Sequence, residues 1–283
     1  MATALIDGIN TRYEVSGQGE PLLMFSPGGF DATLDKWSTL GIYGKTKMMA
    51  ALTAHFQCIV FDRRETGHSG GRVQRITWAD YVAQGKGLLD HLGIARAHLM
   101  GGCMGCAPVV GFAAAHPEAS RSMVLYWPVG GAKYRINGQQ RFAQHWAFVQ
   151  QEGLAAVLAL AQASNKSFSE DPRAGPWVSV LRHDAAFAAA FVAMDVEAYK
   201  LAVLATQRAL LDRDTAPGAE PEELLRLTVP TLIVPGQDNS HATSAARYLQ
   251  ECLSQSDYWD LAPADQTEHN VPDRLLHFLS AQS

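Results

Sequence analysis

The sequence predicts an α/β fold in which a mostly parallel sheet is flanked by helices and interrupted by a helical insertion. Up to about residue 130, short apolar runs alternate with segments of helical periodicity, the pattern of parallel strands joined by helices. From Gly130 to about Thr228 this alternation stops and Ala-rich helical stretches replace it, before an apolar run returns at Val229. Because ligands bind at the carboxyl edge of an open parallel sheet, we expect residues 131–228 to form a cap over that edge. Residues 1–130 and 229–283 would then form the core.

Strands are expected at short apolar runs that end in glycine, proline or polar residues. These runs are Leu22–Ser26, Cys58–Phe61, Ala97–Met100, Met123–Trp127, Val229–Val234 and Tyr258–Leu261. The first is followed by Pro27-Gly28-Gly29 and the third by Gly101-Gly102, so both strands are expected to enter tight turns.

Helices are expected where apolar residues recur at helical spacing, as in the segment that carries Tyr81, Leu88 and Leu92. The core helices are Lys47–His55, Thr77–Leu92, Ala107–Ala115 and Val271–Leu279, and the insertion contributes Phe142–Ala163 and Ala185–Leu211. Helices that follow strands in this order cover both faces of the sheet.

Composition and charge narrow the choice of partners. Of the 283 residues 47% are hydrophobic, which is enough for a large core, and 23 basic against 28 acidic residues give a net charge of -5. Without a basic run, nucleic acid is not expected as a partner. The first residues lack the pattern of a signal peptide, and the longest apolar run, Ala185–Met194, is too short to span a bilayer. We therefore expect a cytoplasmic protein that acts on a small molecule away from membranes, as a monomer or a homo-oligomer.

Gly101-Gly102-Cys103-Met104-Gly105 stands between a predicted strand and a predicted helix. This is the arrangement of a nucleophile elbow, in which small neighbours allow the reactive residue to occupy a strained turn. A helix N-terminus also favours a thiolate over a thiol. The alternative is a buried, inert cysteine in a glycine-rich turn, because free cysteines are commonly buried. The strand–turn–helix context favours the nucleophile.

Besides this elbow, five segments in the appropriate order resemble the α/β-hydrolase superfamily. They are the hairpin around Asp7–Tyr13, the loop Pro27-Gly28-Gly29-Phe30, the polar loop Asp62–Ser69, the turn Pro235–Asp238, and His269 before the last helix. The resemblance covers nearly the whole chain and implies a sheet of about eight strands. It departs from the usual pattern at Pro27, Glu65, Cys103 and Cys106. The cysteine at the nucleophile position resembles dienelactone hydrolases.

The resemblance implies a triad in the chain order nucleophile, acid, base, which assigns Cys103, Asp238 and His269 to these roles. The alternative for Asp238 is an N-cap of the helix that begins near His241. His241 is the main rival to His269 as the base, but it follows Asp238 by three residues, which we expect to be too close for the family geometry. His68 fits no triad position.

The resemblance also implies an oxyanion hole made by the backbone N–H groups of Met104 and Gly29, with Phe30 as the alternative second donor. The candidates for pocket walls are aromatic residues that would otherwise be core: Trp127, Tyr134, Trp146 and Trp177. Glu65 could hydrogen-bond the resting thiol or be a solvated loop charge. Lys133, Arg135 and Arg141 could bind a substrate carboxylate or be solvated surface charges.

These features predict hydrolysis of an ester, lactone or activated acyl bond through an acyl-thioester intermediate, without a cofactor. No metal site is expected, because the histidines lack the close spacing of zinc motifs. On the same fold, a carbon–carbon bond hydrolase and an acyltransferase are the alternatives. From other classes, Cys103 and Cys106 could form a redox pair, or the chain could be a ligand receptor without catalysis.

Overall fold

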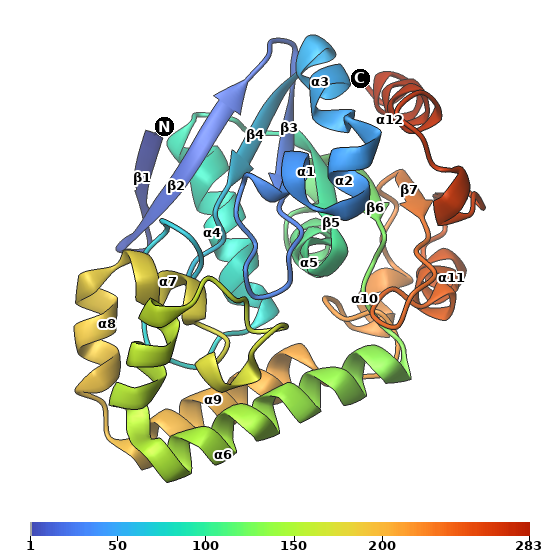
Figure 1. The fold of residues 1–283 in the computed structure, drawn as a ribbon. Helices are drawn as coiled ribbons and strands as arrows, with labels where there is room; N and C mark the ends of the chain where they lie inside the picture. The colour runs from blue at the N-terminus through green and yellow to red at the C-terminus, as the bar shows by residue number, and fades with distance from the viewer. Residues whose placement is uncertain (1) are drawn as a thin grey trace.

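The computed structural model describes residues 2–283, which form one eight-stranded sheet with helices packed around it (Figure 1). The strand order is β1-β2-β4-β3-β5-β6-β7-β8, and the two pairs β1·β2 and β2·β4 are antiparallel while the others are parallel. The strands are β1 (Ala2–Ile6), β2 (Ile9–Ser16), β3 (Glu20–Phe25), β4 (Phe56–Phe61), β5 (Ala97–Gly102), β6 (Ser120–Tyr126), β7 (Thr231–Val234) and β8 (Ser256–Tyr258). The predicted mostly parallel sheet is confirmed. The last strand begins and ends earlier than the apolar run 258–261 suggested.

Helices cover both faces of the sheet, and two apolar clusters separate them. The first cluster joins the sheet to α4 (Trp78–His91), α5 (Cys106–Ala115) and α11 (Thr243–Cys252). The second joins it to α1 (Lys36–Thr39), α2 (Gly41–Thr46), α3 (Met48–His55) and α12 (Asn270–Ser280). Successive residues of a strand point to opposite faces, so a strand buried on both sides is apolar throughout.

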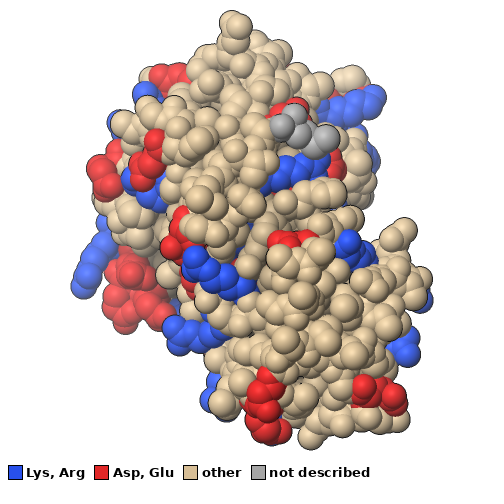
Figure 2. Space-filling model, turned by 90° about the vertical axis from the view of Figure 1, so that its left-hand side faces the viewer, with Lys and Arg blue, Asp and Glu red and all other residues tan. Residues whose placement is uncertain are grey.

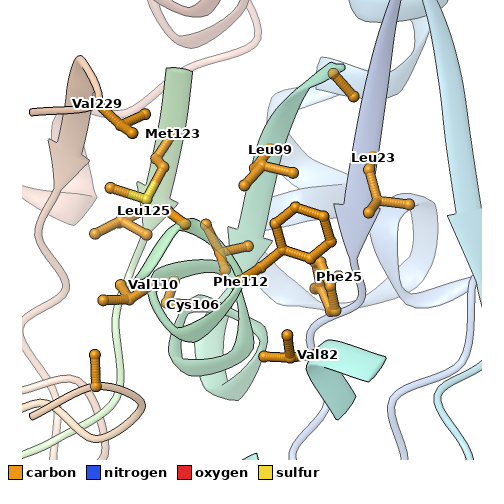
Figure 3. Packing of buried hydrophobic residues seen from close by; sticks show 14 of the residues in the cluster. Leu23, Phe25, Val82, Leu99, Cys106, Val110, Phe112, Met123, Leu125 and Val229 are labelled. Atoms are coloured by element: carbon orange, nitrogen blue, oxygen red, sulfur yellow. The ribbon is translucent and has the colours of Figure 1, made fainter. Parts of the chain in front are cut away.

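Strand β3 shows this arrangement directly. Leu23 and Phe25 belong to the first cluster, whereas Leu22 and Met24 belong to the second. Figure 3 shows Leu23 and Phe25 on the same side of the sheet as Phe112 of α5. The central strands are therefore held between two layers of helices, and their carboxyl ends have fixed positions.

A helical insertion separates β6 from β7 and lies at the bottom of Figure 1. Its helices are α6 (Ala132–Ala163), α7 (Val178–His183), α8 (Ala185–Val192), α9 (Val196–Leu210) and the short α10 (Pro221–Leu224). The stretch predicted as one helix over 185–211 is two helices, because Asp195 caps a new helix by accepting a hydrogen bond from the Ala198 N–H at 2.9 Å. Helix α6 begins at Ala132 rather than Phe142 and breaks at Gly153, where φ is 81°.

The insertion has its own apolar core, which continues into the sheet domain at the elbow. Phe142, Val157 and Tyr199 of the insertion belong to the same cluster as Met104 and Ala107, which lie at and just after the elbow. The carboxyl edge of the sheet is therefore covered by the insertion at the predicted nucleophile.

Positive and negative side chains are interspersed on the face shown in Figure 2, and the lower part of this face, where the insertion lies, has few of either. Over residues 2–283, none of the helices combines the length and apolar character needed to cross a membrane.

Candidate active site

Cys103 lies at the tip of a tight turn between β5 and α5. The strand ends at Gly102, a single 3-10 turn covers Cys103–Gly105, and Cys103 has a φ of 54°, in the left-handed region that side chains other than glycine rarely adopt. A Cβ at Gly105 would overlap the Phe25 carbonyl, and one at Gly101 would overlap the Gly105 carbonyl oxygen. The two glycines therefore allow the backbone to pack closely enough to hold Cys103 in this conformation.

The surroundings of the Cys103 thiol favour its ionised form. Burial raises the pKa of Cys103, but the charge of His241, a hydrogen bond with that imidazole, and the backbone N–H groups of Met104 and Gly28 together lower it below the ordinary value. These four contributions all stabilise negative charge on the sulfur.

His241 connects Cys103 to Asp238. Its Nδ1 lies 2.8 Å from Asp238 Oδ2 and 2.9 Å from Oδ1. Burial lowers the pKa of His241, but the Cys103 sulfur and the Asp238 carboxylate outweigh this effect and raise the pKa to about 10. Within residues 2–283, the buried Nε2 atom has no regular hydrogen bond to another group. The imidazole interacts with the Cys103 thiol and can therefore accept its proton. The arrangement favours a thiolate–imidazolium pair.

The turn after β7 explains how Asp238 reaches a residue so close in sequence. Asp238 Oδ1 accepts hydrogen bonds from the backbone N–H of Ser240 at 2.7 Å and of His241 at 2.9 Å, which bends the chain back over the carboxylate. The hydrogen bond with the His241 ring then lowers the pKa of Asp238 to about 2. The expectation that His241 lies too close to Asp238 is therefore wrong, because the side chain of Asp238 itself forms the turn.

The structure does not bring His269 to this site. His269 is exposed at the N-terminus of α12, where its backbone N–H donates to Thr267 Oγ1 at 3.3 Å. The buried side chain in its loop is Gln266, whose Oε1 accepts hydrogen bonds from Tyr126 Oη at 2.6 Å and Trp127 Nε1 at 3.0 Å. The geometry thus corrects the predicted triad at one position: His241 replaces His269 as the partner of Cys103 and Asp238.

Two backbone N–H groups, those of Met104 and Gly28, interact with the Cys103 sulfur. Donors for an oxyanion must face the position that the oxyanion will occupy beside the sulfur, so Gly28 joins the predicted Met104 as a candidate donor. Gly29 and Phe30 instead line the cavity in front of Cys103. Their loop is held from behind by the buried guanidinium of Arg63, which donates to the Gly29 carbonyl.

A cavity of about 410 Å³ opens over Cys103 and His241. Its apolar walls come from both the core and the insertion: Phe30, Leu40, Met104, Val129, Phe168 and Leu211. Its polar lining consists of Lys36, Tyr134, Arg141, Ser167, Ser169, Glu170 and Ser240. A cavity of this size, with mainly apolar walls and a few polar groups, suits a small-molecule ligand.

Comparisons with known proteins identify the family to which this fold belongs. A family model described as the alpha/beta hydrolase fold matches residues 21–240. The chain belongs to the α/β-hydrolase family. Its structure resembles the enol-lactonase from Burkholderia xenovorans LB400 (TM-score 0.63, 22% identity, covering 99% of this chain and 100% of that one). It also resembles a meta-cleavage product hydrolase from Pseudomonas fluorescens IP01 (TM-score 0.63, 18% identity, covering 100% and 97%).

Two curated relatives match part of this α/β-hydrolase. The 2-hydroxy-6-oxo-6-phenylhexa-2,4-dienoate hydrolase of Comamonas testosteroni is 32% identical over 103 residues, which is 35% of this chain and 36% of the relative. The dihydrolipoyllysine-residue acetyltransferase component of the acetoin cleaving system of Cupriavidus necator is 29% identical over 125 residues, 44% of this chain and 31% of the relative. The chain thus matches about a third of the length of each.

Of the four aromatic pocket candidates in this α/β-hydrolase, Tyr134 lines the cavity, and within residues 2–283 the other three do not. Trp127 packs against the His241 ring at 5.6 Å, Trp146 lies beneath the Lys200 ammonium at 5.1 Å, and Trp177 is buried in the core of the insertion. Most of the residues that do line the cavity were not predicted. Some are polar residues of loops and helix starts, such as Lys36, Ser167 and Ser240, and others are apolar residues, such as Leu40, Phe168 and Leu211. No periodicity distinguishes either group from ordinary surface or core residues.

Glu65 is buried away from the thiol. Its carboxylate accepts hydrogen bonds from Arg64 Nε at 3.0 Å and from the backbone N–H of Arg72 at 3.1 Å. Burial raises the pKa of Glu65 to about 7, and the Arg64 charge limits the rise. Neither the predicted contact with Cys103 nor a solvated position is present, and the carboxylate instead organises the polar loop.

Cys106 lies behind the elbow within the apolar core, close to Val110 of α5 (Figure 3). Its thiol donates to the carbonyls of Gly101 at 3.1 Å and Tyr126 at 3.5 Å. Burial and the neighbouring Cys103 raise the pKa of Cys106 well above the ordinary value. These properties are those of a structural thiol rather than of a reactive one.

Proposed function

We propose that Cys103, His241 and Asp238 form a catalytic triad that hydrolyses an ester, a lactone or another activated acyl bond of a small molecule. The observation that supports this most strongly is the position of the His241 imidazole, which bonds Asp238 through Nδ1 and interacts with the Cys103 thiol. A thiolate is a strong nucleophile at neutral pH, and an imidazolium beside it can protonate a leaving group.

In the first half of the reaction, the Cys103 thiolate attacks the substrate carbonyl carbon and the carbonyl electron pair moves onto oxygen. The N–H groups of Met104 and Gly28, which already face the sulfur, stabilise this oxyanion. When the tetrahedral intermediate collapses, the bond to the leaving oxygen breaks and the His241 imidazolium supplies its proton. The products of this half are the alcohol, or the ring-opened hydroxyl of a lactone, and an acyl thioester on Cys103.

In the second half, neutral His241 takes a proton from water and the resulting hydroxide attacks the thioester carbonyl. Collapse expels the Cys103 thiolate and releases the acid, so that the thiolate–imidazolium pair is restored. Asp238 holds the imidazole through Nδ1 in both halves and stabilises its charged form.

Hydrolysis of a carbon–carbon bond is the second candidate. It is favoured by the similarity to the relative from Comamonas testosteroni, whose name describes a hydrolase of a dienoate. In this reaction the leaving group is a carbanion equivalent, which must be protonated on carbon. Release of a carboxylic acid from a vinylogous diketone acid, with no turnover of any ester or lactone, would favour it over acyl hydrolysis.

The proposed nucleophile is tested by trapping its acyl intermediate. Rapid acid quench of the enzyme with 4-nitrophenyl acetate should yield an acetylated Cys103 peptide in the mass spectrum. Cys103→Ala should lose acetylation and at least about a thousandfold in turnover, the order of loss seen when a triad member is removed. Cys252→Ser is the matched control, since Cys252 is a free thiol on α11 outside the cavity. Acetylation of another residue in an active Cys103→Ala enzyme would refute the proposal.

A further inference from the structure

One face of α6 forms a wall of the catalytic cavity and bears two polar groups without partners. Tyr134, Gly138 and Arg141 all line the cavity and follow one another at helical spacings of four and three residues. The Tyr134 hydroxyl is buried and has no hydrogen-bond partner in residues 2–283. An unpaired buried hydroxyl is costly unless a ligand satisfies it.

Arg141 is the cavity's unpaired cation. Over residues 2–283 its guanidinium makes no hydrogen bond or ion pair, whereas Lys36, the other basic residue of the lining, pairs with Asp31 at 3.0 Å. Glu170, the acidic residue of the lining, accepts hydrogen bonds from the backbone N–H and the hydroxyl group of Ser167. Apart from the Cys103–His241 pair, the lining therefore carries two positive charges and one negative charge, and Arg141 is the cation available to an incoming anion.

The two groups lie at different positions along the wall that α6 contributes to the cavity. Tyr134 and Cys103 line the same cavity, and the Cys103 sulfur adds to the effect of burial in raising the pKa of the Tyr134 hydroxyl, so this hydroxyl lies on the nucleophile's side of the cavity. Arg141 follows seven residues later, which places its backbone on the order of 10 Å further along the helix axis. Between them, Gly138 leaves room that the Leu211 side chain enters, so the wall connecting the two groups is apolar.

We propose that this cavity binds an acyl group bearing a carboxylate remote from the scissile carbonyl, with Arg141 as the partner of the carboxylate and the Tyr134 hydroxyl as a donor to a substrate oxygen near Cys103. The inference rests on the proposed acyl hydrolysis and names its substrate class, the monoesters and activated monoacyl derivatives of dicarboxylic acids. A guanidinium binds a carboxylate through two parallel hydrogen bonds, which gives both affinity and orientation.

The test compares esters that differ in one charge. The 4-nitrophenyl monoesters of glutarate and adipate are paired with the 4-nitrophenyl esters of pentanoate and hexanoate, which have the same numbers of carbons, and the ratio of kcat/KM for the charged over the neutral ester is measured. We expect a ratio above one in the wild type that falls as salt is added, and a ratio about ten- to a hundredfold lower in Arg141→Gln, the effect of a hydrogen-bonded charge.

The matched control is Arg135→Gln. Arg135 lies on the same helix, pairs with Asp214 at 3.1 Å and is outside the cavity lining, so its loss removes a charge without removing the proposed contact. We expect the wild-type ratio in this variant. An unchanged ratio in Arg141→Gln, or an equal fall in Arg135→Gln, would overturn the proposal.

Binding of adipate itself separates this inference from the proposed function. Calorimetry with Cys103→Ala should show adipate binding that weakens at least tenfold when Arg141→Gln is added. If adipate binds in this way while no ester is hydrolysed, the carboxylate site stands and acyl hydrolysis fails. If the esters are hydrolysed at an unchanged ratio and adipate binding does not depend on Arg141, the carboxylate site fails and acyl hydrolysis stands.

Discussion

Arg63 contacts both segments that carry the proposed oxyanion-hole donors, the Gly28-Gly29 loop and Met104. Its guanidinium donates to the Gly29 carbonyl, lies 3.9 Å from Met104 Sδ and stacks over the Tyr81 ring at 4.3 Å. Within residues 2–283, the Nε and Nη1 atoms of Arg63 are buried and have no hydrogen-bond partner. The guanidinium therefore forms its hydrogen bond to the loop through Nη2, which donates to the Gly29 carbonyl. We infer that Arg63 is a positioning residue for the Gly28 N–H.

Arg63→Met should therefore lower kcat about tenfold or more while KM changes little, because a displaced oxyanion donor weakens transition-state binding more than substrate binding. Arg63→Lys should recover part of the loss. Alkylation of Cys103 by iodoacetamide forms no oxyanion, so at a pH high enough to ionise the thiol in both enzymes its rate should stay within about threefold of the wild-type rate. A parallel fall of kcat and alkylation rate in Arg63→Met would instead indicate a general structural role.

The proposed catalytic acid and base belong to a single turn, residues 238–241, which follows β7. The carboxylate of Asp238 has two functions there, since it closes the turn through the backbone N–H groups of Ser240 and His241 and also bonds the His241 ring. Conservative and radical substitutions of Asp238 should separate these functions.

Asp238→Asn keeps an oxygen acceptor for the turn but removes the charge. The pKa of His241 should fall and that of Cys103 should rise, so the acid limb of the kcat/KM–pH profile should move to higher pH. Asp238→Ala should in addition lose the turn, with about 1 kcal/mol less stability, the usual cost of a lost capping acceptor. Thermal unfolding and pH profiles of both variants measure these effects. Identical acid limbs in wild type and Asp238→Asn would show that the carboxylate does not act through its charge.

The same turn shows why the sequence pointed to Cys103 and Asp238 but not to His241 as their partner. Cys103 and Asp238 each follow a recognisable strand, and the order of the strands fixed where they would meet. His241 was set aside because a family resemblance places the base after the last strand, and the Asx-type turn that bends His241 onto Asp238 involves only a few polar residues. An Asp with a Ser two residues and a His three residues later is the signal that could have found it.

The elements were predictable where local patterns agree with burial. The alternating strands of the core were found because both faces are buried, whereas the first turns of α6, AKYRINGQQR, have no apolar periodicity. Their side chains face the catalytic cavity or the solvent rather than a core, so composition alone did not show them to be helical.

The stability of the whole molecule should depend on pH through Glu65. Its pKa in the folded protein is about 7, above the ordinary value, because the carboxyl group is buried. Between about pH 4.5 and pH 7, the folded state therefore retains a proton that the unfolded state has lost, and stability contributed by this group decreases as pH rises.

Glu65→Gln should remove this contribution and flatten the pH dependence of unfolding in that range, where the slope from one group is at most about 1.4 kcal/mol per pH unit. Chemical denaturation at several pH values, with wild type and variant compared, measures the difference. Asp257→Asn is a suitable control, because Asp257 pairs with Arg274 at the protein surface. An unaltered slope in Glu65→Gln would mean that Glu65 is ionised in the folded protein at all these pH values.

The thiolate–imidazolium pair of Cys103 and His241 is central to the proposed function, and the pH dependence of Cys103 alkylation tests this pair most directly. Iodoacetamide labelling, followed by mass spectrometry of the Cys103 peptide, should give a rate that is already high at neutral pH and falls only at acid pH. His241→Gln should move the midpoint toward the value of a free thiol, about 8.5, whereas His269→Gln should leave the wild-type profile unchanged. A wild-type midpoint near that of a free thiol, or a shift caused by His269→Gln and not by His241→Gln, would contradict the account.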